Sequence, residues 1–233
     1  MKMKIVIIIL ARGESKGIPR KNLADLYGKP LVAYMIEKAL QISYESDVIL
    51  STEDQEIAKV GKKYGALVPF MRPKELAEDH VHSLPVVQHA LLEMEKIRGY
   101  KYDLVVYLQP TAPLCRVEDI EECVRCLIEE QNFQSAVTAV KVATHPFKMK
   151  RVVNGNQLVN FIDQGFEDMR PRQELPPVFR RSGAVYASRR SVVMEHQSLV
   201  GDPCKAVFVP EDTAVDIDRP VDLELVRLLM NNN

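Results

Sequence analysis

Short apolar runs alternate with longer amphipathic segments over the first two thirds of the chain. The apolar runs lie at residues 4–10, 46–52, 103–109 and 135–142. A strand that is apolar along most of its length is typical of a parallel sheet that is covered on both faces. These runs therefore predict buried, mostly parallel strands.

The segments between these runs have the spacing of amphipathic helices. Apolar residues recur at about every third or fourth position in the segments 30–43, 53–65, 83–99 and 117–130. Strands and helices in alternation predict an α/β fold with a doubly wound, mostly parallel sheet.

The pattern changes after Val142. A hairpin is predicted at 147–163, with its turn at Asn154, Gly155 and Asn156, and a polar, proline-rich stretch follows. Further strands are predicted at 183–188 and 206–210, before a last helix that begins at Pro220. We interpret 143–181 as a small β-rich insertion that leaves the main sheet. No linker separates independent units, so residues 1–233 are expected to form one domain.

The composition is that of an ordinary globular protein. Of its 233 residues, 46% are hydrophobic and 27% are charged, and the formal net charge is -1. Such a balance gives no general attraction to nucleic acid or to an anionic membrane, so neither is expected as a partner. No run approaches the roughly 18 apolar residues that cross a bilayer, and the first run passes directly into a charged loop, unlike a secretory signal. We therefore expect a cytoplasmic protein.

The cysteines do not predict a disulfide framework or a metal site. There are four, at Cys115, Cys123, Cys126 and Cys204, which is too few and too scattered for a framework in this chain. Cys123 and Cys126 form a C-x-x-C, but it lies in a predicted amphipathic helix with no second ligand pair. Thiols in or beside the core are the expectation.

Cations gather in the segment that leaves the first predicted strand. It contains four of them, together with two glycines and a serine: Arg12, Lys16, Arg20, Lys21, Gly13, Gly17 and Ser15. Ligands of open α/β sheets bind at the carboxyl ends of the strands. Several cations with exposed backbone amides suit a polyphosphate, although the segment is neither a P-loop nor a dinucleotide fingerprint. The alternative is a solvated, positively charged loop.

Two aspartates near the end of the chain form a candidate metal site. Asp216 and Asp218 flank Ile217, so in an extended segment both carboxylates lie on one face. Mg²⁺ commonly takes one or two carboxylates and completes its shell with water and substrate phosphate. The alternative is that Asp218 caps the helix predicted to begin at Pro220.

Two further segments carry polar groups that suit a sugar or an anion. Gln109 and Thr111 follow a predicted strand in a proline-stiffened turn, which is alternatively only structural. A later polar loop holds four arginines, whose forked guanidinium groups match carboxylate and phosphate oxygens: Arg170, Arg172, Arg180 and Arg181. A surface ion-pair cluster or a subunit contact is the alternative for this loop.

Several segments together resemble the acylneuraminate cytidylyltransferase (CMP-sialic acid synthetase) family, which includes synthetases of the CMP-legionaminate and CMP-pseudaminate type. They are ILARGESKGIPRKNL (9–23), RPKELAEDHVHS (72–83), LQPTAPL (108–114), PRQELPPVFRRSGAVY (171–186) and VDIDRPVD (215–222). The resemblance implies a Rossmann-like nucleotidyltransferase fold, a CTP-dependent activity with Mg²⁺, and a homodimer. Such an enzyme transfers CMP from CTP to the anomeric hydroxyl of an acidic nine-carbon sugar, a nonulosonate, and releases pyrophosphate.

The resemblance also implies roles for individual residues. Residues expected to bind the nucleotide, at its phosphates or near its cytidine, are Arg12, Gly13, Ser15, Lys16, Gly17, Lys21, Asn22, Arg72 and Ser83. Residues expected on the sugar side are Gln109, Thr111, Arg172 and Arg180, while Asp216 and Asp218 would hold the metal. Residues expected to act in catalysis are Lys21, Arg12, Lys16 and Arg172, the last reaching the neighbouring subunit's site from the insertion, which would carry the dimer contact.

Two departures leave the identity of the sugar open. Ala112 and Ser182 stand where relatives often carry serine and asparagine, respectively, and both lie near the expected sugar side. A 3-deoxy-octulosonate or other sugar nucleotidyltransferase therefore remains an alternative. A noncatalytic nucleotide sensor is a second alternative, although sensing alone would not require a pair of metal-binding aspartates.

Overall fold

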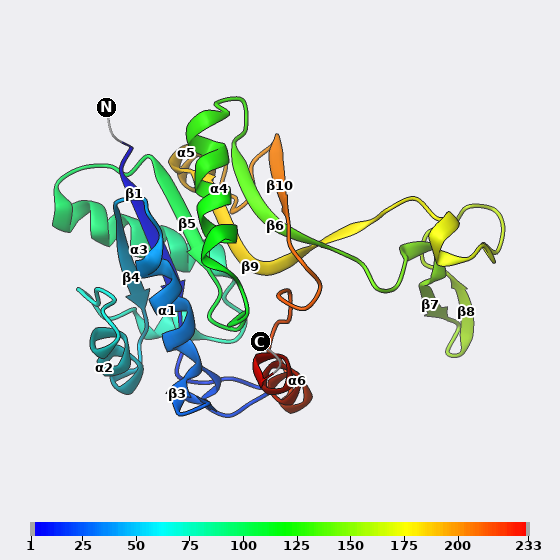
Figure 1. Cartoon of the computed structure of the whole chain (residues 1–233), viewed down its shortest axis with the longest axis horizontal. Coiled ribbons are helices and arrows are strands. Elements are labelled where there is room, and N and C mark those ends of the chain that lie inside the picture. Colours follow the sequence, from blue (N-terminus) through cyan, green and yellow to red (C-terminus); the bar gives the residue numbers. More distant parts are fainter. Residues whose placement is uncertain (1–2, 232–233) are drawn as a thin grey trace.

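A six-stranded sheet forms the centre of the computed structural model, which describes residues 3–231 (Figure 1). In sheet order the strands are β10 (Cys204–Phe208), β6 (Ser135–Lys141), β9 (Phe179–Arg189), β5 (Leu104–Leu108), β1 (Ile5–Leu10) and β4 (Ser46–Ser51). Strand β9 is antiparallel to both of its neighbours, while the other strands share one direction. The predicted mostly parallel sheet is confirmed.

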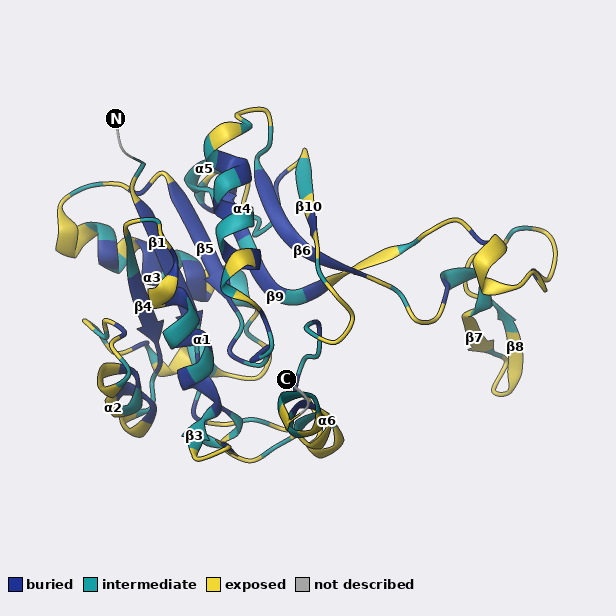
Figure 2. Cartoon of the chain, viewed as in Figure 1, coloured by how far each residue is buried: buried dark blue, intermediate teal, exposed yellow. Residues whose placement is uncertain are grey.

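Helices cover both faces of this sheet, so the strands are buried on each side (Figure 2). One face packs against α1 (Leu31–Gln41), α2 (Gln55–Lys63) and α4 (Val117–Glu129), and the other against α3 (Ser83–Arg98) and α5 (Arg190–Met194). Along β1, Ile7 and Ile9 face the first group of helices, whereas Val6 and Ile8 face the second. Each such buried side chain contributes about 1.5–3 kcal/mol, which explains the continuous apolar runs.

The insertion projects from the body of the molecule as an arm, defined here as residues 143–178 (Figure 1). It contains the hairpin of β7 (Lys150–Val153) and β8 (Gln157–Asn160), with the turn at Asn154, Gly155 and Asn156 as predicted. Phe179 pairs with Lys141 in the main sheet. The last three residues of the predicted insertion 143–181 therefore belong to β9, and the arm ends earlier than expected.

The chain ends in α6 (Pro220–Asn231), which begins at the predicted proline. Its Val226 packs with Leu26, Leu31 and Ile217 in a small separate core. Because Ile217 is fully buried there, the segment that carries the two flanking aspartates is held in place.

The remaining elements are short. They are β2 (Asp25–Leu26), β3 (Lys29–Pro30) and the 3-10 turns Lys21–Leu23, Lys74–Ala77, Pro146–Lys148 and Arg172–Glu174. The cysteines are free thiols, of which Cys115, Cys123 and Cys126 are buried as expected. Within residues 3–231, no helix is long and apolar enough to cross a membrane.

Candidate active site

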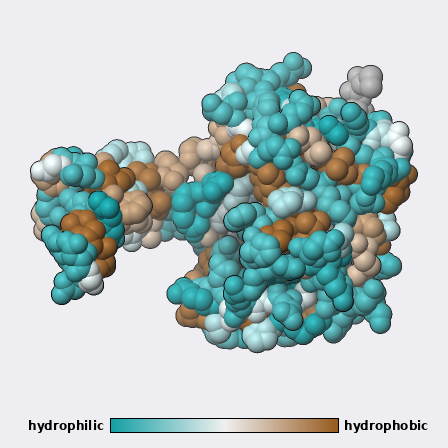
Figure 3. All heavy atoms as spheres, turned by 180° about the vertical axis from the view of Figure 1, so that it is seen from behind, coloured by the Kyte–Doolittle hydropathy of each residue, from teal (hydrophilic) through white to brown (hydrophobic). Residues whose placement is uncertain are grey.

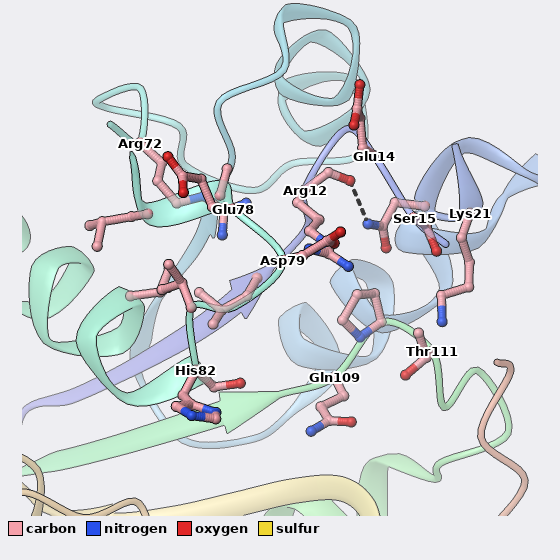
Figure 4. Close-up of a pocket in the computed structure, with 18 of the residues that line it drawn as sticks. Arg12, Glu14, Ser15, Lys21, Arg72, Glu78, Asp79, His82, Gln109 and Thr111 are labelled. Carbon is pink, nitrogen blue, oxygen red and sulfur yellow. Dashed lines mark hydrogen bonds and ion pairs between the residues drawn. The ribbon is translucent and has the colours of Figure 1, made fainter. Parts of the chain in front are cut away.

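A cavity of about 420 Å³ opens at the carboxyl ends of the parallel strands β1 and β5. The predicted site residues that line it are Arg12, Ser15, Lys21, Asn22, Arg72, Ser83, Gln109, Thr111, Asp216 and Asp218. They come from four segments that are distant in the sequence, and Figure 4 shows several of them around one space. The fold thus brings together most of the predicted nucleotide, sugar and metal residues.

Lys21 lies between the cation-rich loop and the aspartate segment. Its Nζ donates to the carbonyl of Ile217 at 2.7 Å and to Oδ1 of Asp218 at 2.9 Å. Gly17 permits this approach of the two segments, because a Cβ at residue 17 would lie 2.0 Å from the carbonyl oxygen of Asp218. Lys21 is therefore a fixed cation at the edge of the cavity, with only 12% of its side chain exposed.

Arg12 and Lys16 share one carboxylate. Nη1 of Arg12 lies 2.7 Å from Oδ1 of Asp79, and Nζ of Lys16 lies 3.0 Å from its Oδ2. In Figure 4 the side chain of Asp79 lies beside that of Arg12. Hydrogen bonds from Lys16 and Arg12 hold the pKa of Asp79 below its usual range. Two of the cations expected to bind phosphate thus already face an anion.

Gly13 and Arg72 are joined by a partly buried carboxylate. The Gly13 amide donates to Oε1 of Glu53 at 2.6 Å, and Nη2 of Arg72 donates to its Oε2 at 2.8 Å. Gly13 does not line the cavity, and its amide is engaged within the protein rather than offered to a ligand. Burial lowers the pKa of Arg72, and the Glu53 carboxylate opposes that effect.

Asn22 presents a buried acceptor beside the cavity. Its Nδ2 donates to the carbonyl of Arg12 at 2.9 Å, whereas its Oδ1 has no partner among the described residues. A buried polar atom without a partner is costly. A donor group on a bound ligand would satisfy it.

The two aspartates present the oxygen ligands that a divalent cation requires. Oδ1 of Asp216 is buried and has no partner within residues 3–231. Burial raises the pKa of Asp216, and the neighbouring Asp218 carboxylate raises it further. A bound cation would compensate both effects, so this pair fits the predicted Mg²⁺. Asp222, in the first turn of α6, accepts at Oδ2 from the amides of Asp218 and Arg219 at 3.2 and 2.8 Å, whereas the Asp218 carboxylate accepts from Lys21.

The comparisons with known proteins agree with this geometry. The cytidylyltransferase family model matches residues 6–230. The chain belongs to the cytidylyltransferase family. It is 36% identical to a pseudaminic acid cytidylyltransferase of Campylobacter jejuni, over 99% of this chain and 98% of that protein. It is 31% identical to a CMP-N,N'-diacetyllegionaminic acid synthase of Legionella pneumophila, again over 99% and 98%.

A solved structure shares the fold of this cytidylyltransferase. It is a CMP:2-keto-3-deoxy-manno-octonic acid synthetase in complex with CTP, with a TM-score of 0.69 and 24% identity over 98% of this chain and 99% of that one. The predicted family and the Rossmann-like nucleotidyltransferase fold are thus confirmed. This protein is a CTP-dependent nucleotidyltransferase.

Strand β9 runs beside Gln109 and so passes close to the cavity of the cytidylyltransferase. The Gln109 amide donates to the carbonyl of Ala184 at 3.1 Å. Gly183 has a positive φ of 91°, and a Cβ there would lie 3.3 Å from Oδ2 of Asp216 and 3.6 Å from Oε1 of Gln109. Glycine therefore lets the strand pass close under two predicted ligand-binding groups.

The predicted arginines of the later loop lie outside the cavity. Nη2 of Arg172 donates to the carbonyl of Val142 at 2.8 Å, and Nη2 of Arg180 donates to the carbonyl of Ala214 at 3.2 Å. Neither they nor Lys16, Gly13 and Gly17 line the cavity within the described part of the cytidylyltransferase.

Sequence reasoning missed several residues that lie in or beside this site. Glu53, Asp79 and Tyr107 contact predicted ligand-binding residues but were not singled out. Glu53 follows the carboxyl end of β4, the same sheet edge as the cation loop, and that position was an available signal. A second hollow of about 360 Å³ adjoins the first at His82, Ser83, Tyr107 and Gln109.

Proposed function

We propose that this cytidylyltransferase transfers CMP from CTP to the anomeric hydroxyl of an acidic nine-carbon sugar, a nonulosonate, and releases pyrophosphate. One observation carries the proposal: fixed cations and the unpartnered oxygen of Asp216 line the same cavity. Both substrates are anions, so a protein of net charge -1 must concentrate cations locally to bind them.

The step is an in-line displacement at phosphorus. The anomeric oxygen of the sugar bonds to the α-phosphorus, the bond from that phosphorus to the β-bridging oxygen breaks, and pyrophosphate leaves with the electron pair. The hydroxyl proton passes to solvent. Arg12, Lys16 and Lys21 would neutralise charge on the phosphates, and most of the rate enhancement would come from this neutralisation and from positioning.

The aspartate pair would hold Mg²⁺. Asp216 and Asp218 lie beside Lys21, on the side of the cavity where the phosphates of CTP would be bound. When bound, the ion would neutralise phosphate charge. Asn22, Arg72 and Ser83 would contact the cytidine end.

The sugar would lie toward Gln109 and Thr111, with Arg180 as a further basic group. The names of the relatives, a pseudaminic acid cytidylyltransferase and a CMP-N,N'-diacetyllegionaminic acid synthase, support a nonulosonate acceptor. Pseudaminic, legionaminic and N-acylneuraminic acids are the substrates to test first. We place the reaction in the cytoplasm, where CTP is available.

The chain would form one catalytic domain whose arm pairs two copies into a homodimer. Apolar side chains that are at least 40% exposed gather on the arm: Met149, Val152, Leu158, Phe161, Ile162, Phe166 and Met169. Figure 3 shows hydrophobic patches on one face of the projecting part. Exposed apolar surface of this kind is typical of an interface. Arg172, which lies outside its own cavity, would reach the site of the partner.

The deciding experiment is pyrophosphate release with CTP and Mg²⁺. The acceptors are pseudaminic, N,N'-diacetyllegionaminic, N-acetylneuraminic and 2-keto-3-deoxy-manno-octonic acids, and ATP, GTP and UTP serve as controls. Release with CTP and one nonulosonate supports the proposal and identifies the sugar. Pyrophosphate release with the octonic acid alone would overturn the proposal. So would the absence of release with every acceptor, if the protein is folded and binds CTP.

A further inference from the structure

Glu53 lies between the two parts of the nucleotide site and belongs to neither. It is the second residue after β4, and its two carboxylate oxygens accept from different segments, the Gly13 amide at 2.6 Å and the Arg72 guanidinium at 2.8 Å. Gly13 belongs to the cation loop that leaves β1, and Arg72 precedes the segment that leads to α3. One side chain thus connects two segments separated by 58 positions of the chain.

The backbone already brings both segments to the same place. The Ala11 amide donates to the carbonyl of Ser51 at 3.1 Å, and the Arg72 amide donates to the carbonyl of Thr52 at 2.9 Å. These bonds fix the main chain on either side of the carboxylate. They do not fix the Arg72 side chain. Glu53 holds that side chain and the Gly13 amide, while Asn22 holds the neighbouring Arg12 carbonyl at 2.9 Å.

Burial makes this connection strong. The side chains of Arg72 and Glu53 are only 4% and 16% exposed. Removal of one partner from such a pair leaves the other charge buried and uncompensated. Nε of Arg72 already has no partner among the described residues, so Glu53 supplies the ion pair of this guanidinium group.

We propose that Glu53 is a positioning residue that sets the cation loop and Arg72 at the separation CTP requires. The inference rests on the proposed function, in which the loop binds the phosphates and Arg72 lies beside the base. Glu53 does not line the cavity and touches no substrate in this scheme. Its loss displaces both ends of the nucleotide site and leaves the sugar side, built from Gln109 and Thr111, in place.

The test compares Glu53→Gln and Glu53→Asp with a matched control. Glu95→Gln removes a carboxylate from another largely buried ion pair, with Arg190, in which the side chains are 9% and 18% exposed. Glu95 is twelve residues from Ser83 along α3, about 18 Å, so its loss lowers stability without reaching the site. KM for CTP, KM for the sugar acid, kcat and the melting temperature are measured for each variant.

The expected result is a KM for CTP raised about tenfold or more in Glu53→Gln, with KM for the sugar within about twofold of wild type. Glu53→Asp keeps the charge and recovers part of the loss, and Glu95→Gln keeps the wild-type KM for CTP despite its lower melting temperature. An unchanged KM for CTP in Glu53→Gln, an equal rise in Glu95→Gln, or no recovery in Glu53→Asp overturns the inference. If the wild-type protein does not bind CTP, both the proposed function and this inference are overturned.

Discussion

Asp79 Oδ1 lies 2.7 Å from Nη1 of Arg12. The other oxygen of the same carboxylate pairs with Lys16 at 3.0 Å, so one anion bridges two of the cations proposed to bind the phosphates of CTP. The nucleotide and Asp79 therefore compete for the same partners. A ligand with several negative charges is best able to displace this carboxylate.

The first prediction follows from this competition. Asp79→Asn removes the competing charge, so the dissociation constant for CTP should fall roughly threefold, as expected for exposed ion pairs. Titration calorimetry at low salt measures it, because salt screens the effect. Glu78→Gln is the matched control, since Glu78 also lines the cavity but pairs with His80. Weaker CTP binding by Asp79→Asn would mean that Asp79 orients the cations instead.

Lys21 is expected to stabilise the transition state. Lys21→Ala should lower kcat/KM by an amount that corresponds to about 2–4 kcal/mol, because the ammonium group meets developing phosphate charge in a partly buried site. Steady-state kinetics with CTP measure this loss. Lys29→Ala, which removes a lysine paired with Glu37, should leave kcat/KM near the wild-type value. A loss limited to thermal stability would indicate a purely structural role for Lys21.

Asp216 gives a prediction about pH and metal. Burial raises the pKa of Asp216 in the folded state. The free energy of unfolding is therefore highest below the pKa of the unfolded chain, where the carboxyl is neutral, and it falls as pH rises through the folded pKa. In EDTA, Asp216→Asn should therefore melt at a higher temperature than wild type at about pH 8, and the difference should shrink toward about pH 4.

Magnesium should reverse the order of the two melting temperatures, so that wild type melts above Asp216→Asn. Added Mg²⁺ raises the melting temperature of wild type, because it binds the folded state, and has little effect on Asp216→Asn. The same melting experiment with and without Mg²⁺ checks this. Equal shifts in both proteins would remove Asp216 from the metal site.

The proposed dimer predicts complementation between subunits. If Arg172 acts in the partner's site, Arg172→Ala and Lys21→Ala proteins are each nearly inactive, but a mixed dimer carries one site with both residues intact. Each mixed dimer should have about half of the wild-type activity, so an equal mixture of the two proteins should recover roughly a quarter after random subunit exchange. Exchange is verified by mass spectrometry of differently tagged chains. Proven exchange without recovery would place Arg172 outside the partner's site.

The fold was predictable where burial left a local pattern. The run at Ile5–Leu10 is apolar because both faces are covered, and this property can be read from the residues alone. Strand β9 was recognised only from Gly183 onward, since Arg180 and Arg181 suggest an exposed loop. The antiparallel direction of β9 depends on the strands with which it pairs, and the local sequence pattern does not predict those partners.

The site was predictable in its cations and aspartates but not in their internal partners. Arg12, Lys21 and Asp216 stand in recognisable motifs. Glu53 stands at the start of a segment whose helical pattern explains it without any further role, and its partner Arg72 is distant in the sequence. Only the fold shows that the two meet.

The arm connects the adjacent antiparallel strands β6 and β9, in the position that the turn occupies in a hairpin. Lys141 faces Phe179, and the Val142 amide donates to the carbonyl of Val178 at 3.0 Å, so the chain leaves and returns at adjacent points. A two-residue Asn-Gly turn could therefore replace the residues between them without opening the sheet. The arm is in this sense a detachable module, and a chain shortened in this way would show whether the main sheet folds without the arm.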